Sequence, residues 1–488
     1  MAIRFILGTS GSGKTRWCID AIAEALRQSD DRPLVFLVPE QATFQVERAI
    51  LSCRGIAGYN RLHILSFNRL QFWLCKTDPS EELSRLGRQM LVRQALSMCS
   101  GRLTLLGDSA ASAGMAAATA ELIGRLHEDN CDPDYLADVA RRILDKDPAS
   151  LSGRKFADIA VVFKTYIELL SRPECDFINP DAVLTQARMH VKDSPFLNQA
   201  RLWVDGFSGF TLQQRDVLFE MLSVCSEASI ALCLDPQALD LNATDAAQLD
   251  PSSLFAPTER TYVDLLTILR HQKMPMDEPI ILSQHPRFNT AAALAQIEHH
   301  FFAAGTPRPV SSRGAITLRG CNDARGEAFF VAGTIRRLVR EGRYRYRDLA
   351  VIVPQMDLYA HYLTAALEHY HIPFFLDRPQ TLHYHPLIEL LTAALTAIQD
   401  DFSLPRMTAL LKVELNGLDF RDADLLDNVC RAFGIGPADW RSEQPWQFGN
   451  TVGLDETERI HRIRKQLFDP LHRLSQELAG TISASQCC

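Results

Sequence analysis

The stretch that decides the fold is GTSGSGKT, residues 8–15. Its glycines let the backbone curl tightly enough for successive N–H groups to point at phosphate oxygens. In this pattern the lysine brings a positive charge to the outer phosphates, and the threonine hydroxyl can bind a magnesium ion. The predicted contacts with a nucleoside triphosphate are Gly8, Ser10, Gly11, Ser12, Gly13, Lys14 and Thr15.

The elements around this loop predict an α/β domain with a parallel sheet. An apolar strand, residues 3–7, precedes the loop, and a helix with one apolar face follows it. Short apolar strands that alternate with helices are typical of parallel sheets. The further predicted strands are 34–38, 62–67, 201–205 and 229–235.

The rest of the chain predicts a helical insertion and a second α/β part. Between the third and fourth strands the periodicity is helical, and a Pro, Ser and Gly-containing linker follows the fifth strand. Beyond the linker, strands are predicted at 315–320 and 349–353, with helices at 328–340 and from about 358. The predicted domains are 1–72 with 199–303 for the first sheet, 73–198 for the insertion, 304–314 for the linker, 315–400 for the start of a second lobe, and 401–488 for a truncated helical segment.

The composition is that of a soluble globular protein. Of the 488 residues, 47% are hydrophobic and 23% are charged, and the net charge of −8 excludes a uniformly basic nucleic-acid coat but allows a local basic patch. No apolar run reaches about 18 residues, so we expect no membrane span. The cysteines form no C-x-x-C pair, so we expect neither zinc nor an iron–sulfur cluster, and a cytoplasmic location is predicted.

Asp205 is the candidate acidic residue of the predicted nucleotide site. It ends the fourth strand in VDGF, residues 204–207, and is predicted to bind magnesium together with Thr15. In P-loop motors a glutamate commonly follows and polarises the attacking water, but here Gly206 follows, and glycine cannot accept a proton. The sequence therefore predicts slow or absent hydrolysis. The alternative for Asp205 is a strand-end residue that caps a loop.

Four segments together resemble a known family. They are RFILGTSGSGKT (4–15), LVPEQATF (37–44), ILSFNRL (64–70) and LWVDGFSGFTLQQ (202–214). In order and spacing they resemble the N-terminal half of AddB, a subunit of bacterial AddAB helicase–nucleases, and most of the chain is similar to superfamily 1 helicases of the UvrD and Rep type. The resemblance implies a P-loop, RecA-like sheet domain with a helical insertion and a partial second RecA-like lobe.

The same resemblance implies ligands and partners. It implies ATP and Mg²⁺ as cofactors, DNA as a partner, and an AddA-like motor subunit in a heterodimer that processes double-strand breaks for recombination. LVPEQATF and ILSFNRL match the segments with which such helicases touch single-stranded DNA, so Gln41, Ser66, Phe67 and Asn68 become candidate strand contacts. Phe67 also continues the apolar run LHILSF, so a place in the core is the alternative.

The departures from the active helicase pattern all weaken motor function. Active helicases have an acidic pair where this chain has Asp205-Gly206, and they usually have an arginine in the segment that reads IVPQMD (352–357) here. They also have a glutamine upstream of the loop that recognises adenine. Only seven residues precede the loop in this chain, which leaves no room for that glutamine. The resemblance therefore implies that ATP binding is kept while translocation is weak or lost. The nuclease domain and the four iron–sulfur cysteines of the family match no residues present, so we expect no nuclease activity and interpret the chain as a fragment or truncated product.

The densest positive segment is RRLVREGRYRYR, residues 336–347. Arginines interleaved with aromatic residues suit a phosphate backbone and unstacked bases. A solvated helix end followed by a surface turn predicts a similar composition and is the alternative. The candidate DNA contacts here are Arg336, Arg337, Arg340, Arg343, Arg345 and Arg347.

Two other function classes remain open at this point. A P-loop kinase or another small-molecule phosphotransferase also begins with strand, loop and helix, although no acceptor pocket can be placed in this sequence. A catalytically silent scaffold is the other alternative, because a ligand at a hundredfold excess over its dissociation constant stabilises a fold by about 2.7 kcal/mol.

Overall fold

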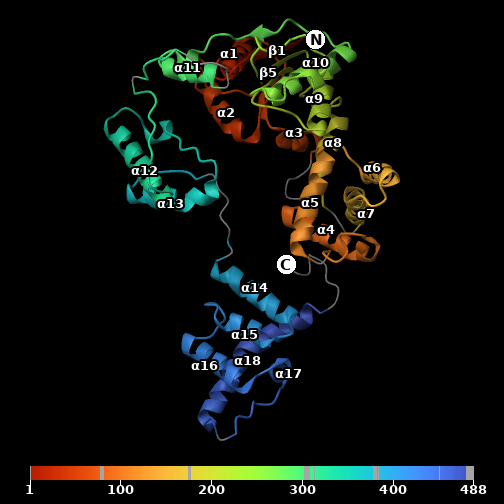
Figure 1. Ribbon diagram of the computed structural model, residues 1–488, viewed down its shortest axis with the longest axis vertical. Helices are drawn as coiled ribbons and strands as arrows, with labels where there is room; N and C mark the ends of the chain where they lie inside the picture. The colour runs from red at the N-terminus through yellow and green to blue at the C-terminus, as the bar shows by residue number, and fades with distance from the viewer. Residues whose placement is uncertain are drawn as a thin grey trace. The chain divides into compact units, whose positions relative to one another are not determined.

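The chain folds into two compact units, Met1–Leu318 and Arg319–Cys488. The computed structural model describes residues 2–76, 82–110, 112–173, 177–301, 308–312, 314–376, 382, 384–449 and 451–479. Figure 1 shows the helices and strands, coloured from red at the N-terminus to blue at the C-terminus.

A parallel sheet forms the centre of the first unit. The strand order is β3-β2-β4-β5-β1-β6, and every pairing is parallel. All five predicted strands are confirmed, whereas β6 was missed because it has only two residues. The strands are β1 (Ala2–Gly8), β2 (Leu34–Leu37), β3 (Leu62–Leu65), β4 (Arg201–Val204), β5 (Glu227–Cys233) and β6 (Ile280–Ile281).

Helices cover both faces of this sheet, which is why strands such as β2 are apolar at every position. Side chains alternate along a strand, so Ile6 packs in one core and Phe5 and Leu7 pack in the other. The core around Ile6 includes α1 (Lys14–Arg27) and α2 (Thr43–Leu51). The opposite core includes α3 (Phe67–Cys75), α8 (Pro180–His190), α9 (Leu212–Val224) and α10 (Ala256–His271).

The segment between β3 and β4 is helical, as predicted. Apart from one isolated bridge between Glu82 and Ile178, its described residues form no strand. Its helices have a core of their own, in which Val92, Ile123 and Phe163 are fully buried. The helices of this core are α4 (Arg85–Cys99), α5 (Ala113–Glu128) and α7 (Leu151–Leu170), and α6 (Pro133–Lys146) packs against α7 through a smaller cluster that includes Leu136 and Ile159.

Short elements complete the first unit. They are the 3-10 turns η1 (Glu40–Ala42), η3 (Ser100–Arg102), η4 (Ala246–Gln248) and η5 (Pro286–Phe288), and the helix α11 (Ala292–His300). Of the predicted linker 304–314, residues 304–307 and 313 lie outside the described residues.

The second unit contains two hydrophobic clusters. The helices predicted at 328–340 and from about 358 are confirmed as α12 (Ala324–Arg340) and α13 (Met356–His369), which pack together through Ala332 and Ala366. The second cluster is built around Trp440 and Phe468. Its helices are α14 (Pro386–Gln399), α15 (Leu404–Leu411), α16 (Phe420–Phe433), α17 (Pro437–Arg441) and α18 (Leu454–Glu477), and the 3-10 turn η6 (Tyr346–Asp348) lies between α12 and α13.

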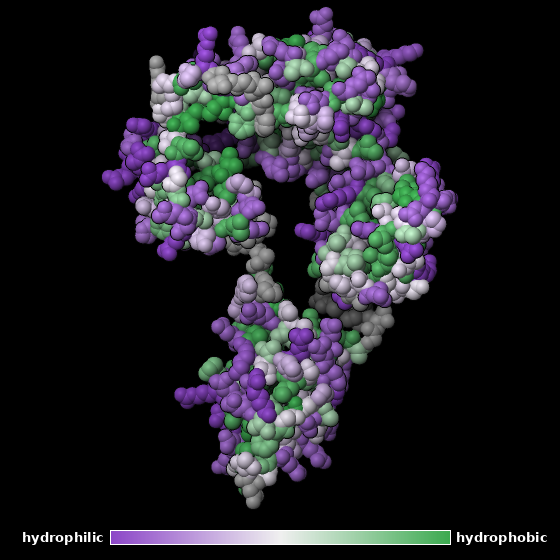
Figure 2. All heavy atoms as spheres, in the orientation of Figure 1, coloured by the Kyte–Doolittle hydropathy of each residue, from purple (hydrophilic) through white to green (hydrophobic). Residues whose placement is uncertain are grey.

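The strands predicted at 315–320 and 349–353 were wrong. Neither segment pairs with a neighbouring strand, and no strand occurs in the described part of the second unit. Leu318 is 97% exposed and Ile352 is 93% exposed, and hydrophobic residues are visible among polar ones on the surface in Figure 2. An apolar run becomes a strand only where another backbone satisfies its N–H and C=O groups, and no described segment pairs with either run.

Candidate nucleotide-binding site

The glycine-rich loop joins β1 to α1, and its shape requires glycine at several positions. Gly11 and Gly13 have positive φ angles of 80° and 96°, in the region that side chains disfavour. A Cβ on Gly8 would lie 2.7 Å from the carbonyl oxygen of Leu282 and 2.6 Å from the Oγ of Ser12. Gly13 caps the N-terminus of α1, where backbone N–H groups favour an anion.

Two polar side chains of this loop, those of Lys14 and Ser12, show where a phosphate would fit. The Nζ of Lys14 donates to the carbonyl oxygens of Gly8 and Thr9, both at 2.8 Å, which folds the ammonium back across the loop. The Oγ of Ser12 is buried and has no hydrogen-bond partner among the described residues. A buried hydroxyl without a partner is rare, and a phosphate oxygen held in the loop would supply one. The loop therefore fits the triphosphate predicted for it.

The structure brings the two predicted magnesium ligands together. Asp205 follows the carboxyl end of β4, and β5 lies between β4 and the loop-bearing β1. Thr15, Asp205 and Gly206 line the same cavity, and interactions with the Thr15 side chain and the Gly206 backbone N–H act to lower the pKa of the Asp205 carboxyl. Hydroxyl and carboxylate oxygens are the ligands that Mg²⁺ prefers, so these residues fit the ion. Magnesium would supply positive charge next to bound phosphates.

Burial of Asp205 raises the pKa of its carboxyl above the ordinary value of 3.8. The hydrogen bonds from Thr15 and Gly206 and the charge of Lys14 oppose this rise without cancelling it. In the absence of a cation, the ionised form is therefore less favoured here than in an exposed aspartate. A magnesium ion that compensates the negative charge would remove this penalty.

Replacing Asp205 with asparagine is expected to stabilise the magnesium-free protein at neutral pH. Because the folded pKa is raised, the wild type has its full stability below the unfolded pKa, about 3.9, and loses stability as pH rises through the folded pKa. Asparagine does not titrate, so the variant does not lose stability in this way. The free energy of unfolding of the wild type minus that of the variant should therefore fall as pH rises. Urea denaturation in chelator at a series of pH values measures this, and a pH-independent difference would contradict it.

The backbone conformation at residue 206 and a close neighbour both favour glycine. Its φ angle is 86°, and an added Cβ would lie 3.0 Å from the Cδ of Pro39. The position after Asp205 therefore has a conformation and a neighbour that disfavour any side chain. The sequence alone showed the missing carboxylate but not this steric reason.

Residues of the glycine-rich loop, together with Asp205 and Gly206, line a cavity of about 720 Å³. Such a volume lies within the usual range for small-molecule sites. The cavity is lined by Ser10, Gly11, Gly13, Lys14, Thr15, Arg16, Asp205, Gly206, Phe207, Phe255, Thr258, Pro286 and Arg287, among others.

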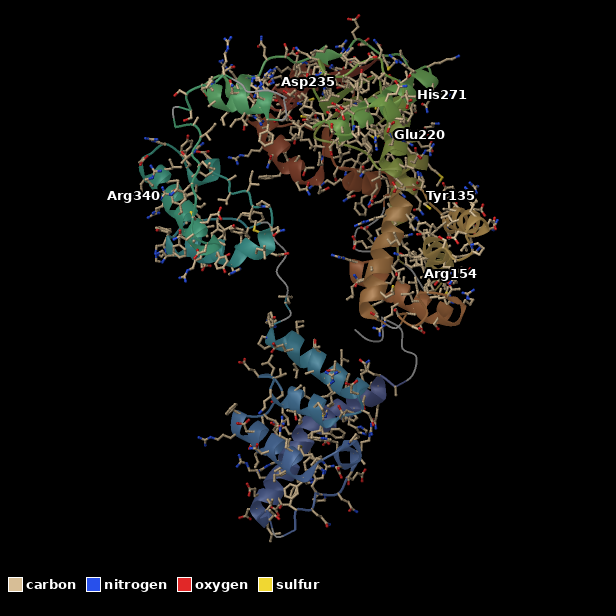
Figure 3. The ribbon with its side chains drawn as sticks, viewed as in Figure 1. Tyr135, Arg154, Glu220, Asp235, His271 and Arg340 are labelled. Carbon is tan, nitrogen blue, oxygen red and sulfur yellow. The ribbon has the colours of Figure 1, made fainter. Side chains whose placement is uncertain are left out.

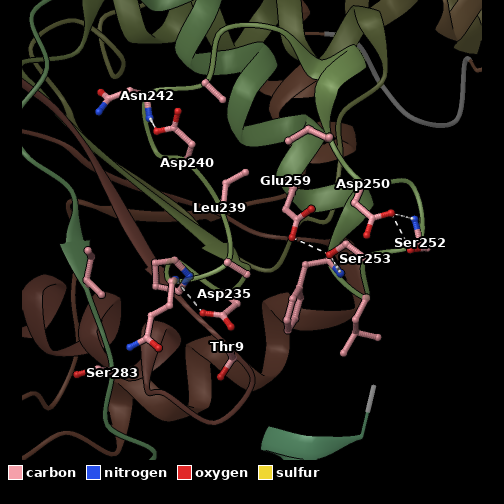
Figure 4. A pocket seen from close by; sticks show the side chains of 18 of the residues that line it. Thr9, Asp235, Leu239, Asp240, Asn242, Asp250, Ser252, Ser253, Glu259 and Ser283 are labelled. Atoms are coloured by element: carbon pink, nitrogen blue, oxygen red, sulfur yellow. Dashed lines mark hydrogen bonds between the residues drawn. The ribbon is translucent and has the colours of Figure 1, made fainter. Parts of the chain in front are cut away.

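A larger cavity of about 1120 Å³ lies beside the loop and has a different character. Thr9 and Ser283 border it, and several acidic residues surround it (Figure 4). Like charges repel, so this cavity is unsuited to phosphates. Within the described ranges no three His, Cys, Asp or Glu side chains converge to hold a metal. Its acidic residues are Asp235, Asp240, Asp245, Asp250, Glu259 and Glu298.

The candidate strand contacts divide into exposed and buried residues. Gln41 and Asn68 are exposed beyond the carboxyl ends of the neighbouring strands β2 and β3. Ser66 is buried: its Oγ accepts a hydrogen bond from the backbone N–H of Arg69 at 3.2 Å, which caps α3, and donates to Glu40. In this conformation Ser66 is not available to a DNA strand.

Phe67 lies in the core rather than on the surface. Its ring is 4% exposed and makes edge contacts with Phe207 at 5.6 Å and Phe210 at 6.1 Å between ring centroids. The aromatic ring exposed at this edge is Phe44, which is 70% exposed near the start of α2. Sequence reasoning missed Phe44, although helical spacing from the buried Val46 indicated a solvent-facing position.

Several arginines of the 336–347 segment are already paired. Arg337 and Arg343 both contact Glu341, at 3.3 and 3.2 Å. Arg345 makes two side-chain contacts with Asp348, at 2.9 and 3.0 Å, and this pairing lowers the pKa of Asp348 to about 2.

The other three arginines of the segment differ from one another. Arg336 donates to the Tyr346 hydroxyl at 2.7 Å and is only partly exposed. Arg340 and Arg347 are exposed, and no ion pair within the described part of the chain involves either. Arg340 lies on the surface of α12 (Figure 3). The available positive charge is therefore smaller than the sequence suggested.

The helices give no sign of a membrane span. Within the described residues, none combines the length and the apolar character that a bilayer crossing needs.

Comparison with known proteins places the chain in a family. The family model described as ADDB, N-terminal, matches residues 5–298. The chain is 32% identical over 96% of its length to the AddB subunit of the ATP-dependent helicase/deoxyribonuclease of Pelotomaculum thermopropionicum, of which it covers 41%. For the corresponding subunit of Symbiobacterium thermophilum the identity is 32%, over 98% of this chain and 42% of that protein. The chain thus spans about two fifths of the length of these curated relatives, and it belongs to the AddB N-terminal family.

Proposed function

We propose that this chain is the ATP-binding, DNA-contacting part of a helicase–nuclease subunit that takes part in double-strand break repair by homologous recombination. The single observation that carries the proposal is the convergence of Lys14, Thr15 and Asp205 at the carboxyl edge of the sheet. One strand separates the strands that carry the loop and the acidic residue, which suits a RecA-like P-loop domain. The relatives are each named as one subunit of a larger enzyme, which supports an AddA-like partner, and a cytoplasmic location stays a prediction.

Hydrolysis by this chain is proposed to be weak. A general base must lie within hydrogen-bond reach of the attacking water. Gly206 offers none, and the neighbouring lining residues Phe207, Phe255 and Thr258 are not carboxylates. The motor activity of the complex is therefore assigned to the partner subunit, while this subunit holds nucleotide.

The test is to measure equilibrium ATP binding and steady-state hydrolysis by the full chain, with and without single-stranded DNA. We expect magnesium-dependent binding and a hydrolysis rate that stays far below the roughly 1 s⁻¹ or more of ordinary enzymes. Vigorous hydrolysis would contradict a disabled motor. Failure to bind ATP would contradict the nucleotide site itself.

DNA contact is proposed for two surfaces. Gln41, Asn68 and the exposed ring of Phe44 lie on the first unit near the ends of β2 and β3, where a base could stack on the aromatic face. Arg340 and Arg347 lie on the second unit and can reach phosphates without breaking an ion pair.

Replacing both Arg340 and Arg347 with glutamine is expected to reduce the salt dependence of single-stranded DNA binding. If each arginine neutralises one phosphate, the slope of log affinity against log salt concentration should become less steep by about 1.4. The measurement is fluorescence anisotropy at several salt concentrations. The matched control is Arg345→Gln, whose side chain is held by Asp348 and should contribute less. An unchanged slope in the double variant removes this surface from the DNA site.

A further inference from the structure

We propose that His285 is a positioning residue of the nucleotide site: it holds Thr9, and through the Thr9 backbone it fixes the glycine-rich loop and Lys14 in a shape that receives phosphate. The inference rests on the proposed function of this loop. The role requires no contact between His285 and the nucleotide. No sequence pattern pointed to it, because His285 lies 276 residues from Thr9 along the chain.

Strand β6 brings His285 to the loop. The strand pairs in parallel with β1, with Ile281 beside Leu7. The backbone N–H of Leu282 then donates to the carbonyl oxygen of Leu7 at 2.8 Å. Because parallel strands end at the same edge of a sheet, the chain that leaves β6 emerges beside the start of the loop. His285 follows Leu282 by three residues and lies against the loop there.

The contact between His285 and Thr9 is short and partly buried. The Nε2 of His285 lies 2.7 Å from the Oγ1 of Thr9, within hydrogen-bond distance, and either atom can donate. The same nitrogen lies 3.6 Å from a carboxylate oxygen of Glu298 in α11. The side chain of His285 is 30% exposed and that of Glu298 is 16% exposed, so both are largely shielded from water that would compete for the contact. Thr9 and Glu298 together orient the imidazole.

The ring of His285 is also held by Phe288. The two rings stack with their centroids 6.3 Å apart, and the backbone N–H of Phe288 donates to the carbonyl oxygen of His285 at 2.9 Å. A Cβ on Gly11 would lie 2.8 Å from the ring of Phe288, so this ring packs against the loop as well. These contacts restrict the positions that His285 can take beside Thr9.

Thr9 links His285 to the residues expected to contact phosphate. Its carbonyl oxygen accepts from the Nζ of Lys14 at 2.8 Å and from the backbone N–H of Ser12 at 3.4 Å. The side chain of Thr9 therefore bonds His285, while its backbone bonds the loop. Fixing Thr9 in advance reduces the conformational freedom that the loop must lose when a ligand binds, and such preorganisation increases affinity.

The test is to titrate the full chain with Mg-ATP, comparing Thr9→Val, Thr9→Ser, His285→Ala and His285→Gln with the wild type. We expect Thr9→Val and His285→Ala each to weaken ATP binding about five- to tenfold, because a hydrogen bond that orders the loop is lost. The double variant should bind no more weakly than either single variant, since both changes remove the same contact. Thr9→Ser keeps the hydroxyl, and His285→Gln keeps a polar group of similar reach, so both should recover most of the affinity.

A matched control and thermal melting separate positioning from a general loss of structure. The control is His299→Ala, an exposed histidine of α11 that borders the larger cavity, and it should bind ATP as the wild type does. Unchanged melting temperatures show that the variants fold. If His285→Ala melts earlier, Thr9→Val still decides, because it only exchanges a hydroxyl for a methyl group.

The outcomes separate this inference from the proposed function. If Thr9→Val and His285→Ala bind ATP normally while Lys14→Ala does not, His285 does not position the loop, and the proposed function stands. If the two losses multiply in the double variant, the residues act independently and the inference is overturned. If the wild type does not bind ATP, the nucleotide site itself is refuted.

Discussion

Replacing Lys14 with alanine is expected to lower the affinity for ATP about 100-fold or more while leaving the fold intact. Among the described residues, its Nζ hydrogen-bonds the carbonyl oxygens of Gly8 and Thr9, so its loss removes two hydrogen bonds within the loop. In the bound state the same ammonium would lie against the phosphates, where hydrogen bonds to charged groups contribute about 1.5–3 kcal/mol each.

Isothermal titration calorimetry with Mg-ATP measures this effect. The matched control is Lys155→Ala, an exposed lysine of α7 far along the chain from the loop, which should bind ATP as the wild type does. Thermal melting without nucleotide should give the same midpoint for all three proteins. Normal binding by the Lys14 variant would mean that the glycine-rich loop is not the nucleotide site.

Installing glutamate at Gly206 is expected to destabilise the protein and not to create a competent ATPase. A side chain there must adopt a φ of 86° and approaches the ring of Pro39 at 3.0 Å. A residue held in the left-handed region costs about 1–3 kcal/mol of unfolding free energy, and the contact with Pro39 adds to this. The backbone would have to change before a carboxylate could orient water.

The comparison of three variants isolates the steric cause. Gly206→Glu and Gly206→Ala should lose similar stability in urea denaturation, because the Cβ causes the conflict. Gly209→Ala is the control: it lies three residues away, and its added Cβ would come no closer than 3.5 Å to another atom. If Gly206→Glu were as stable as the wild type and hydrolysed ATP rapidly, the weakness of this site would have a purely chemical origin.

The local pattern of the first unit was readable because each signal needs only neighbouring residues. GTSGSGKT between an apolar strand and an amphipathic helix predicted the loop that the structure contains, and the runs at 34–38 and 201–205 predicted two central strands. The same approach failed at 315–320 and 349–353, where apolar residues occur without a backbone to pair with. An apolar run states that burial is favourable, but not that a partner strand is present.

In the candidate site, too, some features follow from neighbouring residues and others depend on distant segments. Phe67 looked like a possible base-stacking residue, but Phe207 and Phe210 enclose its ring, and both are distant in sequence. The sequence by itself determined the glycine-rich loop between strand and helix, the candidate magnesium ligands Thr15 and Asp205, and the glycine that follows Asp205. Only the tertiary structure decided which aromatic ring is exposed, why Gly206 must be glycine, and that the chain after β6 lies against the loop. These three features depend on which distant segments the parallel sheet brings to one edge.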